Sequence, residues 1–268
     1  MAKSPKSFEE FYFKPVAKIV PLYVLENYAK THFGKYEKYE GNIFCPECKL
    51  PQLTLVQNYA GESHHLRKYP KQLHDEDCSY NYEHASKKAA IKFFESLSKS
   101  QIEEKLYGMQ LWLEKQSRKA SVQTENSTSK KTRDSNPFLF TISEKGQPTK
   151  TYKTLRRKSL NNNLSDVILG ELYIFYGKVK LETEVRTSSK GNKNNFLIIK
   201  TKNSNGVWIR LITIMRWGKK DDIDPTKECT IFLIGTLGSE YTDRNNNGEK
   251  KINKKQIELF SSSALVIR

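Results

Sequence analysis

The stretch Phe44-Cys45-Pro46-Glu47-Cys48 places two cysteines on one short turn, and His74-Asp75-Glu76-Asp77-Cys78 adds a second pair later in the chain. Two thiolates on a Cys-x-x-Cys turn can reach one ion, and a histidine and a third cysteine complete a four-ligand set. This combination of ligands is typical of tetrahedral zinc. We therefore predict that Cys45, Cys48, His74 and Cys78 hold Zn²⁺ in a structural site, because four protein ligands leave no open position for water.

The sequence leaves the histidine ligand open, because His64, His65 and His84 lie close enough along the chain to compete with His74. A Cys-x-x-Cys pair on its own is also typical of a redox motif, and the nearby His74 and Cys78 favour metal binding. Between the two halves we expect a small hairpin, such as Leu53–Tyr59.

The same residues resemble a known module. Phe44-Cys-Pro-Glu-Cys48, His74, Cys78 and the following segment Glu83-His84-Ala-Ser86-Lys87-Lys88 are similar to the N-terminal zinc module of CoiA-type competence proteins over residues 40–97. The resemblance implies a zinc module in a DNA-related setting. In that family a restriction-type nuclease domain follows, which needs clustered carboxylates and a lysine. Here a Ser- and Lys-rich segment follows instead, so we expect that the protein is not an enzyme.

The chain has 268 residues and a formal net charge of +16. That length is sufficient for two domains with their own cores. A strongly basic surface attracts polyanions, which makes nucleic acid the favoured partner and an anionic membrane surface the rival. The N-terminus is polar, and no apolar run approaches the roughly 18 to 20 residues that span a bilayer. We expect a cytoplasmic protein without a membrane partner, in a reducing compartment that suits cysteine ligands.

Three regions differ in composition. The first, residues 1–116, carries the predicted zinc module and helical periodicity over Leu22–His32 and Ser86–Arg118. Residues 117–163 are polar, and residues 121–160 hold nine basic and three acidic side chains. Such a segment buries too little apolar surface to offset its ordering entropy, so we predict a flexible basic linker. Its apolar stretch Phe138–Ile142 is not assigned to either module.

Residues 164–268 change to the pattern of strands. Alternating or apolar runs occupy Leu169–Glu184, Asn195–Lys202, Gly206–Arg216, Cys229–Leu237 and Gln256–Arg268. Five strands with a long polar fourth connection resemble an OB-fold, and Ile231–Gly238 with the Lys- and Asn-rich segment after it is similar to single-stranded-DNA-binding proteins. The predicted fold class is thus α+β with two modules: a small zinc-bound α/β module with a following helix, then a five-stranded OB-like β-barrel.

Strand alternation predicts which side chains of this barrel face solvent. Val179, Leu181, Leu197, Ile199, Val207, Ile209 and Leu211 should point inward. The outer face then interleaves aromatic rings with cations, as base stacking and phosphate contact require. The predicted nucleic-acid-binding residues are Tyr176, Lys178, Lys180, Phe196, Lys200, Lys202, Trp208 and Arg210, with Lys250, Lys251, Lys254 and Lys255 on a hairpin over Asn245–Lys255. A register slip of one residue would instead bury Trp208 and Phe196.

From these patterns we predict a nucleic-acid-binding protein that prefers single-stranded DNA and is accessory to DNA replication, recombination or transfer. The alternatives are a zinc-stabilised adaptor that binds another protein and a divergent nuclease. The zinc module is expected to contact DNA or a partner protein. The sequence leaves open whether the nucleic acid is DNA or RNA, as well as the oligomeric state, the partner protein and the pathway.

Overall fold

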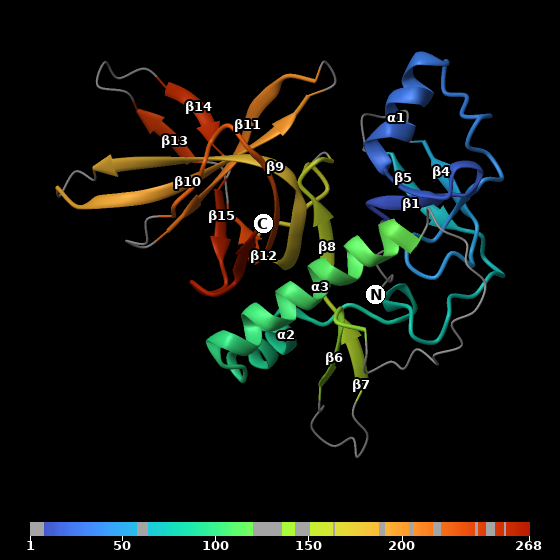
Figure 1. Ribbon diagram of the computed structural model, residues 1–268, viewed down its shortest axis with the longest axis horizontal. Coiled ribbons are helices and arrows are strands. Elements are labelled where there is room, and N and C mark those ends of the chain that lie inside the picture. Colours follow the sequence, from blue (N-terminus) through green and yellow to red (C-terminus); the bar gives the residue numbers. More distant parts are fainter. Residues whose placement is uncertain are drawn as a thin grey trace. The chain divides into compact units, whose positions relative to one another are not determined.

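The computed structural model describes residues 8–57, 64–119, 136–142, 151–162, 164–187, 191–203, 206–216, 221–238, 241–244, 250–254 and 256–268. The chain divides into two compact units (Figure 1). The N-terminal unit comprises Met1–Phe93 and Tyr107–Leu155, and the barrel unit comprises Phe94–Leu106 and Arg156–Arg268. Both units combine helices with antiparallel strands, which confirms the predicted α+β class.

A small sheet opens the N-terminal unit. Its central strand β1 (Glu10–Phe13) pairs antiparallel with β2 (Lys18–Pro21) and with β3 (Ile43–Phe44). Between β1 and β2 the 3-10 helix η1 (Lys14–Val16) reverses the chain. The sequence analysis did not predict this sheet, because each strand is too short for its alternation to stand out.

Helix α1 (Leu22–Thr31) starts directly after Pro21, as predicted. Its buried residues Leu22, Leu25 and Ala29 lie on one face and join the core formed by the β1 aromatic side chains. A hairpin follows the Cys-x-x-Cys turn, as β4 (Leu53–Val56) paired antiparallel with β5 (His65–Lys68). It begins where predicted, but its second strand lies beyond the predicted end at Tyr59.

The predicted helical region after Cys78 is a pair of helices that follows the 3-10 helix η2 (Ser79–Asn81). The first, α2, covers Lys87–Glu95, and the second, α3, covers Lys99–Lys119. Ser98 separates them as a capping box, because its Oγ accepts from Gln101 N at 3.3 Å while its N–H donates to Gln101 Oε1 at 2.8 Å. None of the helices in the described part of the chain is long and apolar enough to cross a membrane.

The described part of the predicted linker is ordered, and that prediction was wrong for it. Strand β6 (Leu139–Ile142) pairs antiparallel with β7 (Thr151–Thr154), and β8 (Arg156–Ser159) pairs parallel with the first barrel strand. Residues 120–135, 143–150 and 163 lie outside the described residues. The composition was misleading because a few apolar side chains supply the burial: Phe138, Leu139, Phe140, Leu155 and Leu160 are all buried.

The barrel unit is built on a ring of five strands, as predicted. Strand β9 (Leu172–Thr187) pairs with β10 (Lys193–Lys202), and β10 pairs with β11 (Trp208–Met215), both antiparallel. Strand β15 (Gln256–Leu259) lies parallel to β11 and antiparallel to β12 (Glu228–Leu237). The ring closes where β12 pairs antiparallel with β9. This closed five-strand layout is that of an OB-like barrel.

Among the described residues, β8 and β16 (Leu265–Ile267) are hydrogen-bonded to this ring, and β13 (Tyr241–Arg244) and β14 (Lys250–Lys254) form a separate two-stranded sheet. The final predicted strand, Gln256–Arg268, is two strands, because β16 turns back after β15 and pairs with β12. The long connection between β12 and β15 carries β13 paired with β14. The predicted hairpin over this connection is therefore confirmed in outline.

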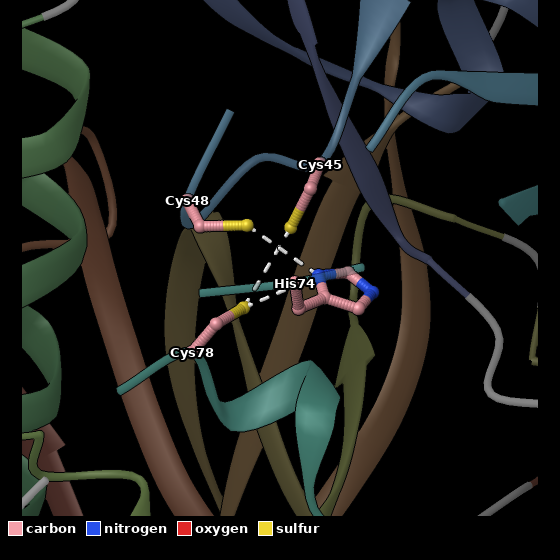
Figure 2. Close-up of side chains that lie close together, drawn as sticks. All are labelled: Cys45, Cys48, His74 and Cys78. Carbon is pink, nitrogen blue, oxygen red and sulfur yellow. Dashed lines mark hydrogen bonds between the residues drawn. The ribbon is translucent and has the colours of Figure 1, made fainter. Parts of the chain in front are cut away.

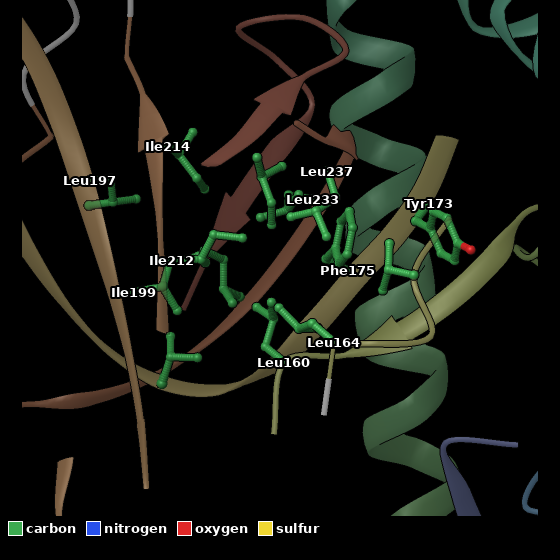
Figure 3. Packing of buried hydrophobic residues seen from close by; sticks show 14 of the residues in the cluster. Leu160, Leu164, Tyr173, Phe175, Leu197, Ile199, Ile212, Ile214, Leu233 and Leu237 are labelled. Carbon is green, nitrogen blue, oxygen red and sulfur yellow. The ribbon is translucent and has the colours of Figure 1, made fainter. Parts of the chain in front are cut away.

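Apolar side chains from all five ring strands fill the barrel (Figure 3). Val179 and Leu181 of β9 and Leu197 and Ile199 of β10 point inward, as alternation predicted. Leu160 and Leu164, from the segment before β9, also belong to this core. The pleat of β9 and β10 therefore matches the register inferred from the sequence.

The inward face of β11 was predicted only in part. Leu211 packs against the core, but Ile209 is 44% exposed and Val207 is 57% exposed. The register between β10 and β11 shifts next to Leu211, so that Ile199 pairs with Ile212 while Lys200 pairs with Arg210. This bulge changes which side chains of β11 face the core, so that Ile212 and Ile214 in its second half point inward. The first half of β11, which contains Ile209, lies outside the pairing with β15, because that pairing includes Thr213 and Ile214 of β11.

Gly235→Ala is expected to lower the free energy of unfolding of the barrel unit by about 1 to 3 kcal/mol, the usual cost of overpacking. A Cβ at Gly235 would lie 2.5 Å from the Glu258 carbonyl oxygen and 2.8 Å from Ile257 Cγ2. Urea denaturation followed by circular dichroism measures the loss. Gly238→Ala is the matched control, because its Cβ would meet nothing closer than the Gln256 oxygen at 3.4 Å. Equal midpoints for the two variants would contradict the close approach of β12 to β15.

Candidate metal centre and nucleic-acid interface

Four side chains of the N-terminal unit converge on one point (Figure 2). The Sγ atoms of Cys45, Cys48 and Cys78 and the ring of His74 offer ligand atoms that all lie within 4.8 Å of one another. Cys45 Sγ is 3.8 Å from Cys78 Sγ, and His74 Nδ1 is 3.4 Å from Cys48 Sγ and 3.5 Å from Cys78 Sγ. This cluster could hold a metal ion, and it contains the four residues that the sequence predicted.

The Cys-x-x-Cys turn is held by the backbone. Cys45 follows β3, and its N–H donates to Pro51 O at 2.9 Å. Lys49 N–H donates to Cys45 O at 3.0 Å, and Lys49 itself has a φ of 62°, in the left-handed region. These two bonds curl the segment so that both sulfur atoms point to the same side of the turn, which is the geometry that a shared ion requires.

The histidine that joins the cluster is His74, which decides the question that the sequence left open. Two aromatic rings lie near it: the Phe8 and Tyr80 ring centroids are each 6.0 Å from that of His74, and the two rings stack on each other with centroids 4.4 Å apart. His65 lies on β5, and His84 forms an isolated bridge with Thr154. His74 Nδ1 faces the sulfur atoms of Cys48 and Cys78.

Ionising all three thiols of the cluster is costly without a cation. Burial raises the pKa of the Cys45 thiol and that of the Cys78 thiol, because a buried thiolate loses its hydration. Hydrogen bonds from Cys45 and Cys78 lower the pKa of Cys48, so one thiolate is stabilised by the other two thiols. A divalent ion would offset the cost of ionising all three, because metal-bound cysteine is deprotonated.

The sequence analysis missed the buried carboxylate that joins the two halves of the cluster. Glu47 is 4% exposed, and its Oε1 and Oε2 accept from Ser79 N and Ser79 Oγ, both at 2.6 Å. Asn136 Nδ2 donates to Glu47 Oε1 and to Asp77 O, each at 2.7 Å. Glu47 thus connects the turn beside Cys48, the residue after Cys78 and a segment far along the chain. An acidic residue inside Cys-x-x-Cys gives no sign of this role, since most glutamates are solvated.

The second candidate site is the outer face of β9, β10 and β11 in the barrel unit. Strand register aligns Lys180 with Lys200, Lys200 with Arg210 and Lys202 with Trp208. Lys178 lies two residues before Lys180 and shares its face. The structure therefore brings together six of the predicted residues: Lys178, Lys180, Lys200, Lys202, Trp208 and Arg210.

Trp208 is the aromatic centre of this face. Its ring is half-buried, with Lys202 Nζ 4.8 Å and Lys180 Nζ 5.5 Å from the ring centroid. Glu228 pairs with Lys202 at 2.8 Å. The hydrogen bond from Lys202 and the charges of Lys202, Lys180 and Lys178 lower the pKa of Glu228.

Two predicted aromatic residues are not available as stacking surfaces. Tyr176 is 5% exposed and stacks on Phe232, with ring centroids 5.5 Å apart. Phe196 is 7% exposed, and the Arg186 guanidinium carbon lies 4.2 Å from its ring centroid. The predicted face was right and the predicted exposure was wrong, because alternation within a strand says nothing of what packs over its outer side.

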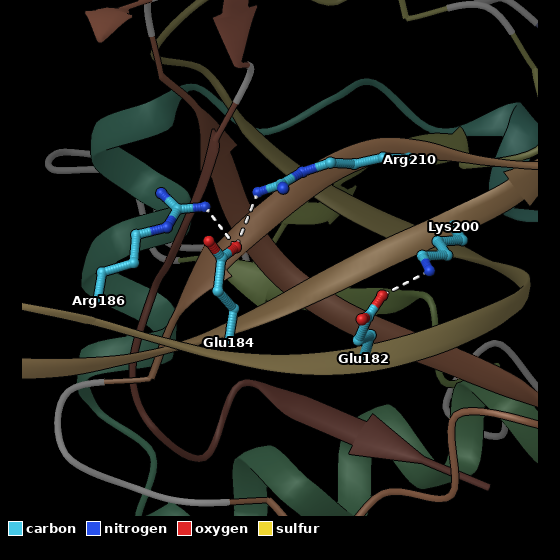
Figure 4. A network of polar contacts seen from close by, with 5 residues as sticks. All are labelled: Glu182, Glu184, Arg186, Lys200 and Arg210. Atoms are coloured by element: carbon cyan, nitrogen blue, oxygen red, sulfur yellow. Dashed lines mark hydrogen bonds and ion pairs between the residues drawn. The ribbon is translucent and has the colours of Figure 1, made fainter. Parts of the chain in front are cut away.

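Ion pairs that the sequence analysis did not predict cross the same face (Figure 4). Lys200 Nζ lies 2.5 Å from Glu182 Oε2. Glu184 Oε2 accepts from Arg186 Nη2 at 2.8 Å and from Arg210 Nη2 at 3.3 Å. These acidic residues continue the outward series of β9 beyond Lys180, so alternation alone could have found them. Of the hairpin residues, Lys250, Lys251 and Lys254 lie on β14, and Lys255 lies outside the described residues.

No protein-family model, curated protein or solved structure matches this chain. The cysteine–histidine cluster and the five-strand ring are consistent with the two resemblances drawn from the sequence, without identifying a family.

Asn136→Ala is expected to lower the free energy of unfolding of the N-terminal unit by about 1 to 3 kcal/mol, because Glu47 and the Asp77 carbonyl each lose a donor. Bound metal should also pass to a chelator faster, since the two halves of the cluster are held less firmly. Thermal unfolding and a colorimetric chelator assay measure the two effects. Asn42→Ala is the control, because that partly buried side chain donates to the nearby Glu40 carbonyl and lies outside the Glu47 network. Metal release at the parental rate would show that Glu47 does not position the ligands.

Proposed function

We propose that the protein binds single-stranded nucleic acid, preferably DNA, on the outer face of β9, β10 and β11. The observation that carries the proposal is Trp208, a half-buried ring with the ammonium groups of Lys180 and Lys202 over it. A base that stacks on this ring takes the place of an ammonium group, which then contacts a flanking phosphate. Bases of a duplex are already stacked on both sides, so a single strand fits this surface better.

The charge of the face supports a polyanionic ligand. Within the described residues it carries six cations, and Glu182 and Glu184 of β9 together with Glu228 of the adjoining β12 supply three carboxylates. The cations are Lys178, Lys180, Arg186, Lys200, Lys202 and Arg210. If the net excess of three charges neutralises phosphates, the slope of log K against log salt is roughly −2 for a single strand. This modest slope leaves stacking as a large share of the affinity.

We infer that the ion of the N-terminal unit is Zn²⁺. Tetrahedral zinc, with Zn–S bonds of about 2.3 Å and a Zn–N bond of about 2.0 Å, places sulfurs about 3.8 Å apart and sulfur about 3.5 Å from nitrogen. The measured separations are 3.8 Å for Cys45 to Cys78 and 3.4 and 3.5 Å for His74 to its two cysteines. Four ligands close the coordination sphere, so the ion stabilises the fold and the reducing cytoplasm suits its thiolates.

A second candidate function is a zinc-stabilised adaptor for another protein. Apolar side chains beside the cluster are exposed: Leu50 by 56%, Leu73 by 78% and Tyr69 by 40%. Leu73 directly precedes the ligand His74, and Leu50 follows the ligand Cys48 by two residues. Exposed apolar side chains of this kind suit a protein partner more than a phosphate backbone.

Purified protein is expected to carry about one zinc per chain, and Cys45→Ser, Cys78→Ser or His74→Ala should lose it and unfold the N-terminal unit. Elemental analysis after purification without chelator gives the metal content. Cys229→Ser and His65→Ala are the matched controls, because neither residue belongs to the cluster. A fully folded chain without zinc would end the metal hypothesis, and normal zinc in His74→Ala would assign the ligand elsewhere.

Trp208→Ala is expected to weaken binding of a single-stranded oligonucleotide by roughly 5- to 150-fold at every salt concentration, which corresponds to the loss of one stacked base. Lys200→Ala should weaken it only at low salt, because at about 1 M salt the screening length falls to about 3 Å. Fluorescence anisotropy of a labelled strand measures both, and Trp208→Phe should retain most of the affinity.

Three outcomes would overturn the proposal. Unfolding of Trp208→Ala would show that the ring is core. Absence of oligonucleotide binding by the folded parent would favour the adaptor. Cleavage of labelled DNA with Mg²⁺ or Mn²⁺, lost on mutation of the chain's own carboxylates, would favour the nuclease.

A further inference from the structure

Arg186 and Phe196 form a second cation–aromatic unit at the other end of the outer face. Register pairs Phe196 with Glu184 and Asn194 with Arg186, so Arg186 and Phe196 are diagonal neighbours on adjacent strands. The guanidinium carbon lies over the ring, 4.2 Å from its centroid. The ring is 7% exposed, so the guanidinium rather than the ring meets the surface.

The guanidinium is held in that position. Glu184 Oε2 accepts from Arg186 Nη2 at 2.8 Å, and the same oxygen accepts from Arg210 Nη2 at 3.3 Å (Figure 4). The Arg186 side chain is 20% exposed, so part of it remains accessible. An arginine fixed by an aromatic ring and a carboxylate loses little side-chain entropy when a ligand stacks on it. Guanidinium planes are established stacking partners of unpaired bases.

The Arg186–Phe196 pair and Trp208 lie at a separation that one single strand can span. Phe196 and Lys202 are six residues apart on β10, and Lys202 pairs with Trp208. At about 3.4 Å per residue the two ends of the face are roughly 20 Å apart. Site sizes of OB-folds start at about 4 nucleotides. Lys200 and Arg210 lie between the two units, where they can contact the intervening phosphates.

We propose that Arg186, held over Phe196 by Glu184, is a second base-stacking platform that works together with Trp208 on one single strand. This inference rests on the proposed function and adds a length requirement to it, since a strand must reach both ends of the face to bind fully. Short oligonucleotides engage one platform, and longer ones engage both. The platform takes a base by its face, so it adds affinity without reading sequence.

The test is a length series of thymidine oligonucleotides, from about two to ten nucleotides, titrated against the full-length parent, Arg186→Ala, Arg186→Lys and Trp208→Ala. In the parent, affinity should rise steeply until both platforms are occupied and then level off. Arg186→Ala and Arg186→Lys should both lose roughly 5- to 150-fold for long strands and nothing for the shortest, including at high salt. Lys193→Ala is the matched control, because it removes an exposed cation from the neighbouring strand on the opposite face.

The variants separate stacking from charge and from folding. Arg186→Lys keeps the charge and can keep the ion pair with Glu184, but it lacks the planar group. Parental affinity in Arg186→Lys, or equal losses in Arg186→Ala and Lys193→Ala, would overturn the second platform while leaving the role of Trp208 intact. Lack of binding by the parent itself would end the proposed function. Circular dichroism of each variant shows whether it is folded, and if Arg186→Ala unfolds, Arg186→Lys alone decides the matter.

Discussion

The length of strand β9 is the constraint on which the barrel depends. Residues Leu172–Lys180 of this strand pair with β12, and residues Lys180–Thr187 pair with β10, so one strand closes the ring and also extends beyond it. Within the ring, Val179 and Leu181 enter the core. On the other side of the same strand, the alternate side chains, from Lys178 to Arg186, form part of the outer face. Closure removes the free edges that an open sheet would expose, and the extension supplies a ladder on which charged and aromatic side chains are placed at fixed intervals.

The N-terminal unit depends on a different kind of constraint, a cluster of ligands joined by one buried carboxylate. Cys45 and Cys78 are as buried as the aromatic side chains around them, at 0% and 1% exposed. Glu47 connects the turn that holds two of the ligands to Ser79 beside the third cysteine and to Asn136. An ion at the centre would therefore stabilise segments that are distant in the sequence, since loss of any ligand loosens contacts with Asn136 as well.

Four cations of the outer face are held in ion pairs. Lys200 is paired with Glu182, Arg186 and Arg210 share Glu184, and Lys202 is paired with Glu228. These pairs reduce the net charge of the face and hold the side chains in fixed positions, which lowers the entropy cost of binding. A surface of this kind relies less on long-range attraction than the total charge of +16 suggests. For the proposed single-stranded ligand, we therefore expect local stacking geometry to contribute more to affinity than bulk charge.

The sequence by itself determined the parts that depend on local spacing. The Cys-x-x-Cys turn, the five ring strands and the outward placement of Lys180, Lys200 and Trp208 follow from short-range periodicity, which the chain cannot change without burying polar groups. Tertiary structure decided the rest. It placed His74, of the four candidate histidines, in the cluster, and it buried Glu47 between two segments of the chain. It also formed β6 to β8 within a polar segment and buried the rings of Tyr176 and Phe196. Each of these depends on a contact between residues far apart in the chain, and the free energy of such contacts comes from burial and hydrogen bonding that no local pattern records.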